Sequence, residues 1–487
     1  FSLSNRQQML FTAPIFPLFF GAVYLLYRLS GHRAQNLLLL VASYFFYAWW
    51  DWRFLSLILL STIVDYTVGI NLISKKKHFT RKLLLSTSIL VNLGLLAVFK
   101  YYNFFLENFV NAFSLFGIQI NANTLNIILP VGISFYTFQT LSYTLDIYKK
   151  KITPTKDFVA FSAFVCFFPQ LVAGPIERAT NLLPQFYNKR IFKYTQAVDG
   201  MRQILWGLFK KVVIADNCAE FANMIFNNST DYSGSTLLLG AIFFTFQIYG
   251  DFSGYSDIAI GTSRLFGFNL KQNFANPYFS RDIAEFWRRW HISLSTWFRD
   301  YLYIPLGGSL GGMSMKIRNT FAIFLVSGLW HGANWTFIAW GAINAIYFLP
   351  LILTNNNRKY LDIVAKGREL PSIKESIAML STFFLTVFAW IFFRAENITH
   401  ALQYINGVFS YSIFEMPAFK GMMDALITLF IIIIFMIVEW KGRENKFAIE
   451  KILLNYKSGT RISIYIVLII MIFLFSNNTQ DFIYFQF

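Results

Sequence analysis

The sequence has 487 residues, of which 56% are hydrophobic and only 14% charged, and its mean hydropathy is +0.48. Apolar runs of about 17 or more residues recur along the chain, which excludes a soluble protein and predicts a polytopic α-helical membrane protein. The net charge of +17 argues for no nucleic-acid partner, because the basic residues cluster in short segments between the apolar runs, as in cytoplasmic loops.

The first third of the chain predicts regular membrane spans. Basic runs at 75–82 and 149–156 mark the cytoplasmic side. No cleavable signal peptide is visible, and residues 1–10 are predicted to be a disordered start or an addition foreign to the natural chain. The predicted spans, each apolar and bounded by charge, are 14–27, 37–50, 54–73 and 83–104.

The middle of the chain mixes apolar and polar residues. Proline and glycine in 127–148 and 158–174 predict a broken or re-entrant helix, which membranes tolerate only beside protein or water. Lys210, Lys211 and Asp216 place 203–226 at an interface or an aqueous cavity. The segment 237–266 carries two carboxylates that need partners. Each acid has a hydroxyl four residues away, Tyr255 for Asp251 and Ser253 for Asp257, which is within reach on a helix. The two acids are therefore either solvated or locally hydrogen-bonded structural groups, or part of a site.

Residues 271–318 form a basic, tryptophan-bearing segment without a span of its own. Apolar residues at helical spacing predict an amphipathic helix on the cytoplasmic membrane surface, with His291 beside the apolar stripe and next to Trp287. The stripe consists of Phe286, Trp290, Leu294, Trp297 and Tyr301, and the surrounding cations are Arg281, Arg288, Arg289 and Arg299. The glycine-rich loop at 305–312 lacks the Lys-Ser/Thr ending of a P-loop, which argues against nucleoside triphosphate binding.

His331 lies near the middle of the apolar segment 321–350. An ionisable residue at such depth is a candidate functional residue, although a packing helix with a histidine as polar contact is the alternative. Gly328 and Gly332 flank it and allow close helix approach, and Asn334 is predicted to share its helical face and bond the ring. Because the basic loop 358–374 is predicted to be cytoplasmic, segment 320–353 must turn back, with a break at 332–334.

The remaining apolar segments are ordinary spans, at 377–393, 422–438 and 462–475. The sequence thus predicts about eleven membrane-inserted segments in a single integral-membrane domain, 1–487. Its two cysteines give no disulfide framework. The two histidines His291 and His331 have no metal-ligand spacing, so no metal site is predicted.

The chemistry that these residues permit is broader than one reaction. A neutral imidazole at His291 or His331 suits general-base catalysis of acyl transfer to a hydroxyl. The arginine and tryptophan cluster suits a donor that carries phosphates and a ring, such as a nucleotide-linked thioester. Buried histidine and aspartate are also typical of proton relays, so a proton-coupled transporter stays open.

Residues 286–308 closely resemble the signature of membrane-bound O-acyltransferases (MBOATs) of the bacterial AlgI type. Further motifs resemble the same family, at 129–139, 174–178, 251–257, 328–335 and 482–487. The resemblance implies an all-α ring of about eleven tilted transmembrane helices with cytoplasmic amphipathic helices and a central tunnel. It further implies that His331 is the catalytic residue and His291 the second hallmark position.

The resemblance also implies a reaction. Acetyl-CoA is the expected donor substrate, with no cofactor, and the acetyl group is expected to cross the bacterial inner membrane to a polysaccharide, directly or through an extracytoplasmic SGNH-type partner. Alginate, cellulose, peptidoglycan and other glycans stay open as acceptors, as does D-alanyl transfer to teichoic acid as in DltB. We expect membrane lipid around the protein and His331 as general base. The expected supporting residues are Asn334, Trp330, Asp257 and Asp300, and the expected donor-binding residues are Arg288, Arg289, Arg299, Trp287 and Trp290.

Overall fold

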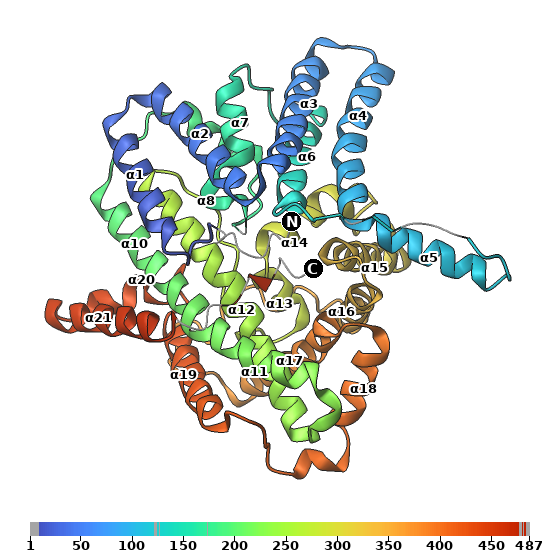
Figure 1. Ribbon diagram of the computed structural model, residues 1–487, viewed down its shortest axis with the longest axis vertical. Helices are drawn as coiled ribbons and strands as arrows, with labels where there is room; N and C mark the ends of the chain where they lie inside the picture. Colours follow the sequence, from blue (N-terminus) through green and yellow to red (C-terminus); the bar gives the residue numbers. More distant parts are fainter. Residues whose placement is uncertain are drawn as a thin grey trace. The chain divides into compact units, whose positions relative to one another are not determined.

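The computed structural model describes residues 9–120, 124–125, 127–172, 174–476, 480 and 482–483. Every regular element in this part of the chain is a helix, which confirms the predicted all-α class (Figure 1). The expectation for residues 1–10 falls mainly on residues 1–8, which lie outside the described residues. The helices group into two compact units, Phe1–Ala197 with Thr262–Lys271, and Val198–Gly261 with Gln272–Phe487.

The first unit contains the predicted N-terminal spans. Gly132 precedes the helix that follows the polar segment, and its φ of +73° and closeness to the Leu171 carbonyl suit glycine. The predicted break in 158–174 is confirmed, because Phe167 leaves the helical conformation between two short helices. The helices are α1 (Ile15–Leu29), α2 (His32–Asp51), α3 (Leu55–Ser74), α4 (His78–Leu96), α5 (Tyr102–Ser114), α6 (Ile133–Tyr148), α7 (Phe158–Cys166), α8 (Phe168–Leu171) and α9 (Ala179–Tyr187).

Two helices, α10 (Tyr194–Leu208) and α12 (Gly234–Leu265), begin in one unit and end in the other. The second unit holds the histidine segment and the C-terminal spans. Its other helices are α11 (Asp216–Asn227), α13 (Ile283–Arg289), α14 (Ile292–Phe298), α15 (Gly312–His331), α16 (Trp335–Leu353), α17 (Ile373–Arg394), α18 (Ile398–Val408), α19 (Met422–Lys441), α20 (Ile449–Ile452) and α21 (Ser458–Leu474).

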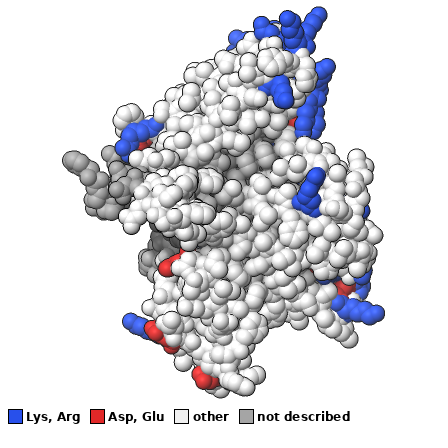
Figure 2. Space-filling model, turned by 90° about the vertical axis from the view of Figure 1, so that its right-hand side faces the viewer, with Lys and Arg blue, Asp and Glu red and all other residues white. Residues whose placement is uncertain are grey.

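Several helices have the length and composition of membrane spans. Six helical stretches of the described chain are long and apolar enough to cross a bilayer, and three shorter ones are also apolar. On the face shown in Figure 2, charged side chains are few and leave a broad uncharged surface. The protein is therefore a multi-pass membrane protein, while the count of eleven segments stays a prediction. The six stretches are His32–Ser74, His78–Ser114, α12, α16, α17 and α19.

The two carboxylates of α12 have partners that the sequence reasoning missed. Lys211 contacts Asp251 at 2.9 Å, and Lys210 contacts Asp257 at 2.5 Å. Both lysines lie in a π-helical turn, Phe209–Ala215, and both are buried. The partners found are cations that precede α12 in the chain, whereas the sequence had indicated the hydroxyls of Tyr255 and Ser253 on α12 itself.

The predicted amphipathic surface helix is also wrong. The segment forms two short helices, α13 and α14, separated at His291, whose backbone is left-handed with φ of +42°. Its apolar stripe packs into the protein interior rather than onto a membrane surface, since Phe286 and Trp290 are each 1% exposed.

Candidate functional site

His331 lies at the end of α15, at the tip of a helical hairpin. α15 and α16 pack along each other, and Gly332, with extended backbone, ends α15. This confirms the predicted turn-back of the segment and its break at 332–334. Close packing requires glycine, because a Cβ on Gly328 would overlap the Phe337 carbonyl, and one on Gly341 would overlap that of Phe324.

The His331 side chain is 3% exposed and lies among aromatic rings from three helices. The ring centroids of Trp330, Trp340 and Phe393 lie 4.9, 5.1 and 5.2 Å from its own. Trp390 of α17 stacks on Trp340 behind them. These rings fix the imidazole in position at the end of its helix.

Asn334 does not share a helical face with His331, contrary to the prediction, because it lies outside α15. Its side chain caps α16 by accepting from the Thr336 backbone, and its Nδ2 donates to the Glu396 carbonyl at 2.7 Å. Asn334 therefore fixes the turn that follows His331 and joins it to the chain after α17.

His291 is brought close to His331 through a shared neighbour. The Trp330 ring lies 6.0 Å from His291 and 4.9 Å from His331. His291 is buried, and its Nδ1 lies 3.2 Å from Asn273 Oδ1. Asn273 Nδ2 donates to Ser256, so Oδ1 is the accepting atom and His291 Nδ1 carries the proton. A histidine held in left-handed backbone with a fixed tautomer is typical of a functional position.

Burial lowers the pKa of His291 from 6.5 to about 3. The folded protein therefore keeps His291 neutral at pH values where the unfolded chain protonates it. As the pH falls below the unfolded pKa of 6.5, protonation stabilises the unfolded chain and the free energy of unfolding decreases. From pH 7.5 to 5, wild-type unfolding free energy is expected to fall by about 2 kcal/mol more than that of His291→Gln. Equilibrium unfolding of both proteins across this range measures the difference.

A control variant keeps the acceptor but adds charge. Asn273→Asp places a carboxylate at His291 Nδ1, which favours the imidazolium. The free energy of unfolding of this variant should therefore depend less steeply on pH than that of the wild type. Identical slopes in the wild type and His291→Gln would show that His291 is not held neutral by the fold.

A cavity of about 450 Å³ lies beside this cluster in the second unit. Its lining combines apolar residues with three cations, Arg299, Lys316 and Arg358. Lys316, Thr320, Ser327 and His331 follow each other at helical spacing on α15, and Ser327 lies about 6 Å before His331 along the axis. The apolar and polar lining is completed by Trp287, Leu294, Ser295, Phe298, Tyr303, Ser309, Ile323, Phe324, Phe348, Ile352, Asn355 and Asn357.

The structure separates the predicted donor-binding residues into two groups. Arg299 and Trp287 line the cavity. Arg289 instead pairs with Glu285 at 2.8 Å, Arg288 donates to the carbonyls of Asn357 and Tyr360, and Trp290 is buried among aromatic rings. These three residues support the walls of the site and do not line this cavity.

The predicted supporting acids lie at different places. Asp300 contacts Arg299 at 2.8 Å, beside the cavity. Asp257 bonds Lys210 and accepts from Gln203 at 2.7 Å, in the buried ion-pair cluster described above.

The polar residues of the site that the sequence did not indicate include Asn273, Lys316, Ser327 and Arg358. Ser327 and Lys316 were accessible in principle, since they precede His331 by four and fifteen residues and share its helical face. Asn273 and Arg358 join the site through tertiary folding, and no spacing in the sequence indicates either.

Comparison with known proteins identifies the family. The chain matches the membrane-bound O-acyltransferase family over residues 44–360. It is 42% identical over 412 residues to the probable alginate O-acetylase AlgI of Pseudomonas aeruginosa, covering 84% of this chain and 76% of the relative. It is 37% identical over 433 residues to a peptidoglycan O-acetyltransferase of Helicobacter pylori, covering 82% and 80%. A teichoic acid D-alanyltransferase of Streptococcus thermophilus is more distant, at 29% identity over 50% of this chain and 62% of the relative.

Together with the helical membrane fold and the paired histidines, these matches show that the chain belongs to the membrane-bound O-acyltransferase family and is an acyltransferase.

Proposed function

We propose that the protein is an O-acetyltransferase of the bacterial cytoplasmic membrane that takes acetyl from cytoplasmic acetyl-CoA and delivers it to hydroxyls of an extracytoplasmic polysaccharide. Similarity to the alginate and peptidoglycan enzymes over more than four-fifths of the chain supports the acetyl group and the glycan acceptor. The D-alanyl alternative has weaker support, since the corresponding relative matches half of the chain. Delivery through an SGNH-type partner is part of the proposal.

The observation that supports the donor assignment is the cavity lined by cations, by apolar residues and by Lys316, Thr320 and Ser327 of α15. Arg299, Lys316 and Arg358 suit the phosphates of coenzyme A, because guanidinium and ammonium groups bind phosphate oxygens strongly. The apolar wall from Phe324 and Phe348 suits the pantetheine arm, whose thioester end would point along α15 toward His331. From these cations we infer that the mouth of the cavity faces the cytoplasm.

In the proposed reaction, His331 acts as general base. Its imidazole takes the proton from the acceptor hydroxyl, the oxygen attacks the thioester carbonyl, and the carbon–sulfur bond breaks. The departing thiolate then takes the proton from the imidazolium, which regenerates the neutral base. An acetyl-imidazole intermediate is the less favoured variant. Trp330 and Asn334 would hold the imidazole and the turn after it, and His291 would position the donor or the acceptor through its Nε2 edge.

Turnover of acetyl-CoA by the purified protein, with its partner transferase and acceptor, tests the proposal directly. Free thiol release and acetyl transfer should both depend on acetyl-CoA. If transfer proceeds without dependence on acetyl-CoA, the donor assignment fails. A flux of protons or solute without thioester cleavage would favour the transporter instead.

The cationic side of the cavity makes a specific prediction about affinity. Lys316→Glu with Arg358→Glu should raise the KM for acetyl-CoA at least about tenfold while kcat changes little, because uniform binding to the distant phosphates is lost. Lys359→Glu is the matched control, since it neighbours Arg358 in sequence but does not line the cavity. Steady-state kinetics with acetyl-CoA varied checks both, and an unchanged KM in the double variant would contradict this donor site.

A further inference from the structure

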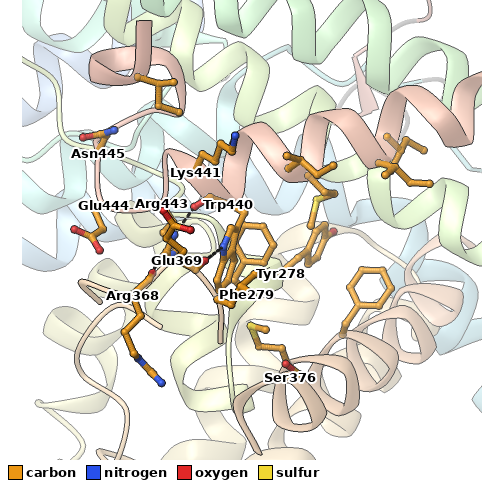
Figure 3. A pocket seen from close by; sticks show the side chains of 18 of the residues that line it. Tyr278, Phe279, Arg368, Glu369, Ser376, Trp440, Lys441, Arg443, Glu444 and Asn445 are labelled. Carbon is orange, nitrogen blue, oxygen red and sulfur yellow. Dashed lines mark hydrogen bonds between the residues drawn. The ribbon is translucent and has the colours of Figure 1, made fainter. Parts of the chain in front are cut away.

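A second large groove in the second unit lies between the membrane helices α17 and α19 (Figure 3). Its volume is about 1440 Å³, and its floor is formed by Ile242 and Phe246 of α12 together with Tyr278. Small-molecule sites usually have volumes of about 300–1,000 Å³, so the groove has room for a larger ligand. It shares no lining residue with the cavity beside His331.

Most of the groove is apolar and lies on helices that face lipid. Leu380 of α17 is 58% exposed, and Ile433 and Ile437 of α19 are 58% and 51% exposed. Both helices are long and apolar enough to span the bilayer. The groove therefore opens toward hydrocarbon rather than water, and its natural contents are acyl chains. Its apolar walls are Met379, Leu380, Phe383, Leu429, Ile432, Ile433, Met436 and Ile437.

One end of the groove is charged. In Figure 3 the labelled charged side chains gather at this end, around Trp440. Arg443 is occupied by the backbone carbonyls of Val364 and Ala365, and Arg368 pairs with Glu375 at 2.7 Å. These two arginines therefore shape the loop that closes the end of the groove.

Two lysines at the same end have no such internal partner. Lys441 ends α19 and Lys451 lies in the short helix α20, and both are exposed. Neither contacts a carboxylate within the part of the chain that the structure describes. The lining also contains Glu369 and Glu444, of which Glu444 accepts a bond from the Gly367 backbone. The two lysines thus offer positive charge to a ligand at the groove end.

Trp440 marks the boundary between the apolar and the charged part. Its Nε1 donates to the Glu369 carbonyl at 2.7 Å, and the Arg443 guanidinium lies 4.2 Å from its ring centroid. Tryptophan in this setting is typical of the level where hydrocarbon meets head groups. Along α19, Ile437 and Ile433 lie about one and two turns deeper than Lys441. The groove is therefore apolar in its depth and cationic at its end, which matches the acyl chains and the charged head group of a phospholipid.

We propose that this groove binds a phospholipid with an anionic head group, taken from the leaflet on the Lys441 side. The acyl chains lie between α17 and α19, and the head group lies against Lys441 and Lys451. The basic loops that contain Arg368 and Lys451 place this end on the cytoplasmic side, where anionic lipids attract basic residues. The proposal is independent of the acyl donor and acceptor.

The groove floor is continuous with the aromatic cluster around His331, so a bound lipid would support one wall of that cluster. Each ring in the series packs on the next with centroid distances between 5.1 and 6.0 Å. The rings in order are Phe383, Tyr278, Trp290, Trp390, Phe393 and His331.

Native mass spectrometry of the purified full chain, titrated with phosphatidylglycerol or phosphatidylcholine of the same acyl chains, tests the proposal. We expect phosphatidylglycerol to bind more tightly. Lys441→Glu with Lys451→Glu should weaken its binding at least about tenfold, because each cation near an anionic lipid contributes about a factor of five. Lys75→Glu with Lys76→Glu is the control, since it makes the same charge change on exposed lysines outside the groove.

A second pair of variants tests the apolar half. Ile433→Trp fills the groove and should weaken binding of both lipids, whereas Ile434→Trp changes a neighbouring exposed residue that does not line it. Melting temperatures of all variants control for folding. Equal binding of the two lipids, no bound phospholipid, or equal losses in the groove and control variants would each overturn the proposal.

Discussion

His331→Ala is expected to lower acetyl transfer by about 10²–10⁴-fold, because removing a positioned general base removes a contribution of this size. The loss should appear in kcat rather than in the KM for acetyl-CoA, since in the proposed reaction the imidazole acts on the reacting atoms and not on the distant phosphates. The imidazole is buried among three aromatic rings, so no other described side chain can move into its place without rearranging the packing. Single-turnover measurement of thiol release and acetyl transfer gives the two quantities separately.

The control for this variant is His78→Ala, which removes an exposed histidine at the start of α4. His331→Gln is also informative, because it keeps side-chain bulk in the aromatic surroundings and should be as inactive as alanine. Trapping acetyl mass on His331 would favour the covalent variant of the reaction. Normal turnover by a well-folded His331→Ala protein would remove His331 from the mechanism.

The hairpin that carries His331 could be predicted from the sequence because several nearby features of the segment all indicate a turn. The length of the apolar segment, the basic loops on both sides and the glycines together require a turn near 332–334, and α15 ends at His331. The same reasoning failed for 283–298, where period alone indicates one amphipathic helix. The left-handed backbone of His291 is held by tertiary contacts such as the one to Asn273, which no hydrophobic period records.

The buried charges illustrate a second limit. Asp251 and Asp257 were recognised as expensive in a membrane, but their partners Lys211 and Lys210 lie 40 and 47 residues earlier in sequence. The contact depends on close packing, because a Cβ on Gly254 would lie 2.8 Å from the Gly207 carbonyl. Sequence patterns thus identified residues that need partners, while the fold determined which partners they have.

The fold also determines which of the predicted donor-binding residues line the cavity. A cluster of arginines in sequence suggested a phosphate site, but Arg289 and Arg281 both pair with the buried Glu285 and stabilise α13. The cations that line the cavity come from three separate segments, at Arg299, Lys316 and Arg358. Charge density along a chain therefore predicts that a basic region exists and does not predict which of its side chains face a cavity.

The hairpin glycines provide a test of how the fold positions His331. In an isolated helix, Gly→Ala is stabilising by about 1 kcal/mol, because glycine loses more backbone entropy. At Gly328 the sign is expected to reverse, since the added Cβ would overlap the Phe337 carbonyl, a backbone atom that cannot move aside alone. We expect Gly328→Ala to lower stability by about 1–3 kcal/mol through overpacking. The separation of α15 from α16 should also reduce acetyl transfer by about 100-fold, as displacement of a reacting group by about 1 Å does.

Gly94→Ala is the matched control, because Gly94 lies inside α4 and nothing would contact its Cβ within 4 Å. This variant should keep full activity and an equal or higher melting temperature. Thermal unfolding and acetyl transfer of both variants, measured in the same detergent, separate packing from helix propensity. If Gly328→Ala is as stable and active as Gly94→Ala, the close crossing of α15 and α16 does not hold His331 in place. If Gly328→Ala is destabilised and inactive, the loss of activity comes from displacement of His331, since the residue itself is retained. The residual thiol release of the variant measures the size of this effect.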